Sequence, residues 1–121
     1  MAGQTFVTNT FSPMMLGEGT AARVQEITIK VAREMVKDTP EGLRVSAVSH
    51  ELTAPVISAL LGVECQANRI NVSLDSSDTL IAIIPGFRAS VAREFTREEV
   101  AAAGARCFLV VGEAAECGGW A

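Results

Sequence analysis

The chain has 121 residues, which is enough for one domain and too short for two. Hydrophobic residues make up 49% and charged residues 20%, a composition typical of a globular core. The net charge of −4 disfavours bulk electrostatic binding to DNA or long RNA. The chain has one Trp and no Tyr, too few aromatic rings for a platform on which several bases stack.

The cysteine and histidine content also limits the chemistry. The one His and three Cys, none in a C-x-x-C motif, cannot build a zinc site of familiar type within one chain. We therefore expect neither a metal nor a cofactor. An odd number of cysteines without a disulfide framework is typical of a reducing compartment. Because the first residues lack a basic segment followed by an apolar run, we expect a cytoplasmic protein with no membrane contact.

In the first half of the chain, apolar spacing predicts a strand over residues 4–8, a strand over 23–29 and a helix over 30–37. The intervening segment 9–19 is rich in turn residues and is predicted to be a loop. Met14 and Met15 in this loop are expected to fill the core rather than to contact a ligand. Residues 39–42 form a break, and residues 43–48 fit neither helix nor strand clearly.

In the second half, Val56 and Leu60 at i, i+4 spacing predict a helix over residues 53–61, which Gly62 ends. Alternation over residues 68–74 predicts a half-buried strand. Residues 75–78 form a turn, and the run 79–84 is apolar on both faces, as in the centre of a sheet. A capping box at residues 96–99 opens a helix to about residue 103, and residues 106–111 form the last strand.

These elements, about five strands and three helices in mixed order, predict an α/β sandwich of a sheet and helices, in a single domain over residues 1–112. Residues 113–121, with two adjacent glycines, are expected to form a flexible tail.

His50 is the first candidate for chemistry. It lies just before the predicted helix 53–61, whose amino end favours negative charge and can hold a phosphate. An unperturbed His titrates near 6.5, roughly where a general acid or base works best. The alternative is a histidine that only satisfies a backbone group at the helix entry.

Two arginines and two polar residues form a second group of candidates. Arg69 lies on the outward face of the predicted strand 68–74, and Arg88 follows the Pro-Gly break after the central strand. Arginine binds phosphate oxygens through a two-pronged fork. Asn9 and Ser12 follow the first strand and can bind a base edge or a phosphate. The alternatives are solvated surface charge for the arginines and turn chemistry for Asn9 and Ser12.

Four segments resemble signature blocks of one family, the viral anti-CRISPR ring nucleases directed against type III systems and their cellular relatives. Residues 8–16 (TNTFSPMML), 48–53 (VSHELT) and 66–72 (QANRINV) resemble the blocks N-A-F-S-x-x-M-L, G-H-D-S-T and K-N-R-V-x-V. A fourth block from Arg88 to Val100 fits in order and spacing. The resemblance extends from about Phe6 to Val111 and is poor over residues 21–43.

The resemblance implies an α/β fold with a mixed five-stranded sheet flanked by helices. It implies a homodimer that binds cyclic tetra-adenylate, the second messenger of type III CRISPR defence, on its two-fold axis. It implies metal-independent cleavage to linear di-adenylate with a 2′,3′-cyclic phosphate. The catalytic residues would be His50 as general acid and Arg88 on the phosphate. Residues that contact the ligand would be Asn9, Ser12, Ser49 and Arg69.

The sequence departs from the family pattern at three positions. Ser49 replaces the usual Gly, Glu51 the usual Asp, and Val91 an acid that often follows the loop arginine. The loss of that acid leaves open a second function, a binding protein that sequesters the messenger without cutting it. A third alternative is a structural or transcription-associated viral protein with no nucleotide ligand.

Overall fold

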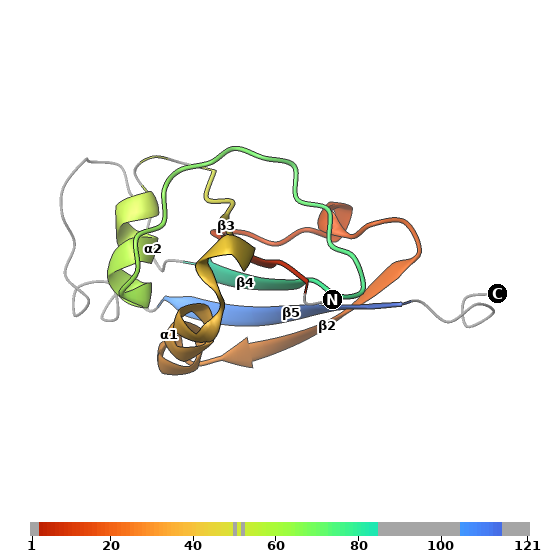
Figure 1. The fold of residues 1–121 in the computed structure, drawn as a ribbon, viewed down its shortest axis with the longest axis horizontal. Coiled ribbons are helices and arrows are strands. Elements are labelled where there is room, and N and C mark those ends of the chain that lie inside the picture. The colour runs from red at the N-terminus through yellow and green to blue at the C-terminus, as the bar shows by residue number, and fades with distance from the viewer. Residues whose placement is uncertain (1–2, 50, 52, 85–104, 115–121) are drawn as a thin grey trace.

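The computed structural model describes residues 3–49, 51, 53–84 and 105–114. Its core is a five-stranded sheet with the strand order β2-β5-β4-β1-β3. The strands are β1 (Thr5–Thr8), β2 (Thr20–Ile27), β3 (Arg44–Ser46), β4 (Thr79–Ile84) and β5 (Arg106–Ala114). β1 pairs in parallel with β3 and β4, whereas β5 pairs antiparallel with β4 and β2 (Figure 1). The predicted mixed five-stranded sheet is therefore confirmed, with the apolar strand β4 at its centre.

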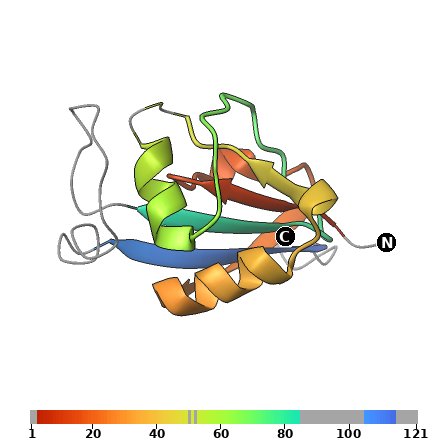
Figure 2. The same ribbon diagram turned by 60° about the vertical axis from the view of Figure 1, so that its left-hand side comes forward.

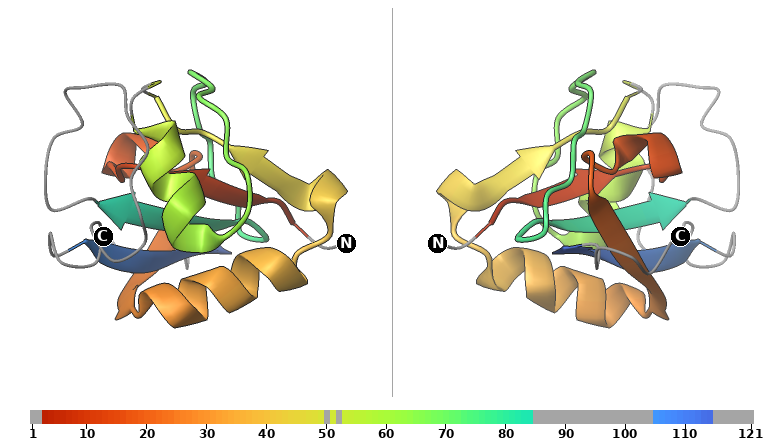
Figure 3. Two further views of the ribbon diagram at one scale, coloured as in Figure 1. Left: turned by 90° about the vertical axis from the view of Figure 1, so that its left-hand side faces the viewer. Right: turned by 90° about the vertical axis from the view of Figure 1, so that its right-hand side faces the viewer.

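Two α-helices, α1 (Ile29–Asp38) and α2 (Ala54–Leu61), pack on the same face of the sheet (Figure 3). Ala32 and Val36 of α1 meet the apolar face of α2 above Ile81 and Ile83 of β4. Both helices were predicted, and the capping of α2 is as expected, with Pro55 in the first turn and Gly62 in the left-handed conformation at φ 70°. Within the described residues the helices cover one face only, so the sheet is not flanked on both sides by them.

The boundary between β2 and α1 differs from the prediction. The strand ends at Ile27, the helix begins at Ile29, and Thr28 between them is the N-cap. The Thr28 hydroxyl oxygen accepts a hydrogen bond from the backbone N–H of Val31 at 3.1 Å, and such a cap satisfies one of the free donors of a helix start. The two helices are also joined directly, because the Arg33 guanidinium donates two hydrogen bonds to the Leu60 carbonyl, at 3.0 and 3.2 Å.

The opposite face of the sheet is covered by irregular chain. Val72 and Leu74 pack against Phe6, Leu80 and Val110, and Phe11 and Met15 from the loop after β1 contact the same cluster. Met15 therefore fills the core as expected, but Met14 is 90% exposed, so that expectation is wrong for it. Met14 lies in a short 3-10 helix, Pro13–Met15, that turns its side chain to solvent.

The predicted strand over residues 68–74 is wrong. This segment leaves α2, runs along the β3 edge and returns at the opposite end of the sheet before β4 (Figures 1 and 2). Among the described residues its strand-like pairing is limited to two isolated bridges, Ala67 with Val48 and Leu74 with Leu16. Ile70 is 42% exposed while Leu74 is fully buried. The segment lies across one face of the sheet, and its side chains Val72 and Leu74 pack against that face. This packing, and not pairing as a strand, explains the alternation.

The carboxyl end of the domain also extends further than predicted. β5 runs to Ala114, and Arg23 of β2 forms an ion pair with Glu113 at 3.0 Å. Glu113 and Ala114 therefore belong to the sheet and not to the expected tail, because β2 supplies them with a partner strand. The predicted helix over residues 96–103 and the segment 115–121 lie outside the described residues. No helix in the described part of the chain is long and apolar enough to cross a membrane.

Gly112 of β5 lies directly against the turn before β4. Its N–H donates to the Asp78 carbonyl at 3.0 Å, and a Cβ at this position would overlap the Asp75 carbonyl oxygen. We expect Gly112→Ala to lower the free energy of unfolding by about 1–3 kcal/mol, because backbone must move to admit a methyl group. Urea denaturation measures this change. Gly42→Ala is the control, since nothing lies within 4 Å of its Cβ position; equal costs at both sites would contradict the explanation.

Candidate functional site

The candidate site lies at the carboxyl end of β1, which stands between its parallel partners β3 and β4. The chain runs from β1 to β2 at one edge of the sheet, through α1 to β3 at the other edge, and through α2 to β4. In open sheets with parallel strands, ligands bind outside the carboxyl ends of the strands. Asn9 follows β1 directly, Ser49 comes three residues after β3, and β4 ends at Ile84, four residues before Arg88.

Three of the predicted site residues meet at this end of the sheet. The side-chain oxygen Oδ1 of Asn9 accepts hydrogen bonds from the backbone N–H of Ser49 at 3.1 Å and from its hydroxyl at 3.3 Å. On the other side, Nε of Arg69 donates to the Ser49 carbonyl at 2.8 Å. Ser49 is thus fixed from both sides by residues 40 and 20 positions away. Because Ser49 immediately precedes His50, this network holds the backbone that leads into the histidine.

The same side chains carry donors that have no hydrogen-bond partner in the part of the chain that the structure describes. These donors are the Asn9 amide nitrogen and the terminal NH2 groups of Arg69. Ser49 and Arg69 are exposed and, with Ile70 and Asn71, line an open hollow of about 460 Å³. A guanidinium with free NH2 groups beside an amide N–H donor is suited to an anionic ligand. These donors can therefore bind a phosphate group at a solvent-exposed site.

The remaining predicted site residues are placed differently. His50 and Arg88 lie outside the described residues, although the structure places both neighbours of His50, Ser49 and Glu51. Ser12 acts locally: its hydroxyl accepts a hydrogen bond from the Met14 N–H at 3.3 Å and caps the short 3-10 helix. The alternative of turn chemistry thus describes the contacts of Ser12, whereas Asn9 makes long-range contacts that turn chemistry does not explain.

Two structural residues of the site were missed. The buried hydroxyl of Thr8 donates to the Ala47 carbonyl and accepts from the Thr10 N–H, both at 3.3 Å, and so ties the end of β1 to β3. Asn68 donates from its side chain to the Ser46 carbonyl and from its backbone to the Val48 carbonyl, both at 2.7 Å. A polar residue inside the third motif block was a signal for Asn68, but nothing local distinguishes Thr8.

The role of Asn9 leads to a stability prediction. Asn9→Ala removes the acceptor of two hydrogen bonds and leaves the Ser49 N–H without its partner, so we expect the free energy of unfolding to fall by about 1 kcal/mol. Asn9→Asp keeps an oxygen at the same position and should retain most of this stability. Urea denaturation of both variants checks this; an equal loss in the two would contradict the acceptor role of Oδ1.

Comparison with known proteins agrees with the fold. A family model described as STIV B116-like matches residues 5–107, which is most of the chain. The chain belongs to the STIV B116-like family. The family match covers the first three motif blocks and the start of β5, where the fold brings Asn9, Ser49 and Arg69 together.

Two viral proteins are similar to this chain. B116 of Sulfolobus turreted icosahedral virus has the same fold, with a TM-score of 0.79, 22% sequence identity, and coverage of 90% of this chain and 99% of that one. "Uncharacterized protein 26" of Sulfolobus islandicus filamentous virus is 35% identical over 72 residues. That alignment spans 60% of this chain and 58% of the length of the viral protein.

Proposed function

We propose that this protein is a metal-independent ring nuclease that opens cyclic tetra-adenylate to linear di-adenylate with a 2′,3′-cyclic phosphate. The observation that carries the proposal is the convergence of Asn9, Ser49 and Arg69, which come from three separate motif blocks. Ser49 immediately precedes His50 in the sequence. The motif blocks themselves resemble those of ring nucleases. The convergence gives that resemblance a physical basis, because these residues place hydrogen-bond donors outside the carboxyl ends of parallel strands, where open sheets bind ligands.

The proposed reaction needs little from the protein, because RNA carries its own nucleophile. The ribose 2′-OH attacks the adjacent phosphorus in line, the 2′-O–P bond forms, and the P–5′-O bond breaks. His50 donates a proton to the leaving 5′-oxygen, and the proton of the 2′-OH passes to solvent. Arg88 and the free NH2 groups of Arg69 stabilise the charge that builds up on the phosphate oxygens. Positioning and charge stabilisation account for the catalysis.

Homodimer formation is part of the proposal. A cyclic tetranucleotide has repeating symmetry, and a two-fold dimer presents each binding group twice to a ring of matching symmetry. Two copies of Arg69 and Arg88 in one pocket also explain how a chain with a net charge of −4 binds a ligand with four negative charges. Since the matched relatives are viral proteins, the activity would act against the type III CRISPR defence of an infected host.

The test is incubation of the purified protein with cyclic tetra-adenylate in excess EDTA, followed by mass spectrometry of the products and light scattering for the oligomer. Linear di-adenylate formed by a dimer supports the proposal. An intact ring that co-elutes with the protein instead supports the second candidate, a sponge that binds without cleavage, which the loss of an acid at Val91 favours. No binding and no cleavage would contradict both and favour a structural viral protein.

A further inference from the structure

The hollow at Ser49 extends past the donors of Arg69 to two further side chains. Ser49, Arg69, Ile70 and Asn71 line it together. Ile70 is 42% exposed, although Val72 in the same segment is buried. Asn71 is also exposed, and its side chain forms no hydrogen bond with any residue in the ranges that the structure describes. The hollow therefore presents a cationic donor, an apolar surface and an amide next to one another.

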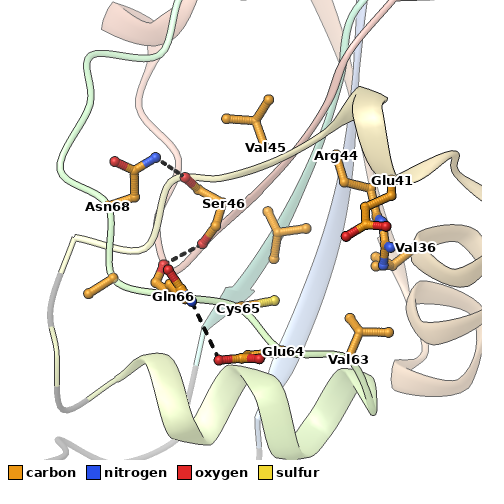
Figure 4. Close-up of a pocket in the computed structure, with 12 residues that line it drawn as sticks. Val36, Glu41, Arg44, Val45, Ser46, Val63, Glu64, Cys65, Gln66 and Asn68 are labelled. Carbon is orange, nitrogen blue, oxygen red and sulfur yellow. Dashed lines mark hydrogen bonds between the residues drawn. The ribbon is translucent and has the colours of Figure 1, made fainter.

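The backbone of residues 69–71 is held at both ends. Before it, the Ser46 hydroxyl donates to the Gln66 carbonyl at 2.6 Å, and the Asn68 side chain donates to the Ser46 carbonyl at 2.7 Å (Figure 4). After it, Val72 is buried and packs against the sheet. Because these contacts fix the backbone before a ligand arrives, less conformational entropy is lost when the side chains of this segment bind.

The three kinds of group match three parts of a nucleotide. The guanidinium of Arg69 suits a phosphate. The aliphatic side chain of Ile70 can pack on the flat face of a base, which is largely apolar. The amide of Asn71 carries an acceptor beside a donor, and adenine carries the complementary pair in its 6-amino group and the adjacent ring nitrogen. Together these side chains favour a nucleotide with an adenine base over an isolated phosphate.

We propose that Asn71 is a specificity-determining residue that binds the edge of one adenine of the ring, with that base packed on Ile70 and its phosphate on Arg69. The Asn71 oxygen accepts a hydrogen bond from the 6-amino group, and the Asn71 NH2 donates to the adjacent ring nitrogen. This assignment rests on the proposed ring nuclease function. In a two-fold dimer the two copies of Asn71 contact two of the four adenines.

The test compares cyclic tetra-adenylate with a cyclic tetranucleotide of unsubstituted purine, which lacks the 6-amino groups. Equilibrium binding of both rings is measured with the wild type and with Asn71→Ala. In the wild type, removal of the amino groups should weaken binding at least about tenfold, because each of two paired contacts loses a hydrogen bond. Asn71→Ala should bind cyclic tetra-adenylate at least about tenfold more weakly than the wild type does, and should bind the two rings within about twofold of each other, because the partner of the amino group is gone.

Ser73→Ala is the matched control, since Ser73 is exposed in the same segment but does not line the hollow. It should bind both rings as the wild type does. Ile70→Ala should weaken binding of the two rings by the same factor, because packing on an aliphatic side chain does not depend on the 6-amino group. Equal binding of both rings by the wild type, or an undiminished preference for cyclic tetra-adenylate in Asn71→Ala, would overturn the role of Asn71 and leave the proposed ring nuclease function intact. A wild type that neither binds nor cleaves cyclic tetra-adenylate would overturn both proposals.

Discussion

Replacement of His50 by alanine should lower the rate of ring opening about 10²- to 10⁴-fold, the usual contribution of a positioned general acid. The 5′-oxygen is a poor leaving group unless it receives a proton as the P–O bond breaks, and His50 is the one histidine in the chain. The affinity for the intact ring should change little, because charge on the arginines supplies most of the binding. Single-turnover cleavage and equilibrium binding of cyclic tetra-adenylate measure these two quantities separately.

Lys37→Ala serves as the control for His50→Ala, since Lys37 is exposed at the end of α1, outside the candidate site. Its cleavage rate should match that of the wild type. A His50→Ala variant that cleaves at the wild-type rate would show that another group, or water, protonates the leaving oxygen. Loss of binding together with cleavage would instead assign His50 a role in holding the ring.

Leu74→Ala should lower the free energy of unfolding by about 2–5 kcal/mol, the range for truncation of a fully buried leucine. Leu74 packs with Phe6, Leu80 and Val110 on the sheet face that the helices leave uncovered. Two hydrogen bonds also fix its backbone. The Leu74 N–H donates to the Met15 carbonyl at 2.7 Å, and the Leu74 carbonyl accepts from the Gly17 N–H at 2.8 Å. A cavity left by truncation could not close easily there. Chemical denaturation gives the value.

Ile70→Ala is the matched control for this prediction. On a half-buried strand over residues 68–74, Ile70 and Leu74 would point to the same side and their truncation would cost similar amounts. In the irregular segment Ile70 is 42% exposed, so we expect a loss below about 0.5 kcal/mol. Comparable losses for the two variants would contradict the irregular path of this segment across the sheet.

The helices and strands that depend on short-range contacts are predictable from the residue pattern alone. The structure confirms α2, which the i, i+4 spacing predicts, with Pro55 and Gly62 at its ends. It also confirms β4, which the apolar run predicts. The reason is that helix periodicity and capping involve residues within about four positions of one another. The boundary at Thr28 was missed even though its cap is equally local, because the apolar spacing of residues 23–29 continues across it.

Contacts between segments that are distant in the sequence could be found only from the tertiary structure. The alternation at residues 68–74 indicates that some of these side chains are buried. It does not show whether they are buried by a partner strand or by the face of the sheet. The candidate site follows the same logic. Asn9 and Arg69 could be chosen from their chemistry and Ser49 from the family resemblance. Their contact depends on β1, β3 and the segment after α2 reaching one end of the sheet. Parallel strands need long crossover connections, so their pairing is fixed by packing between residues tens of positions apart and leaves no local signal in the sequence.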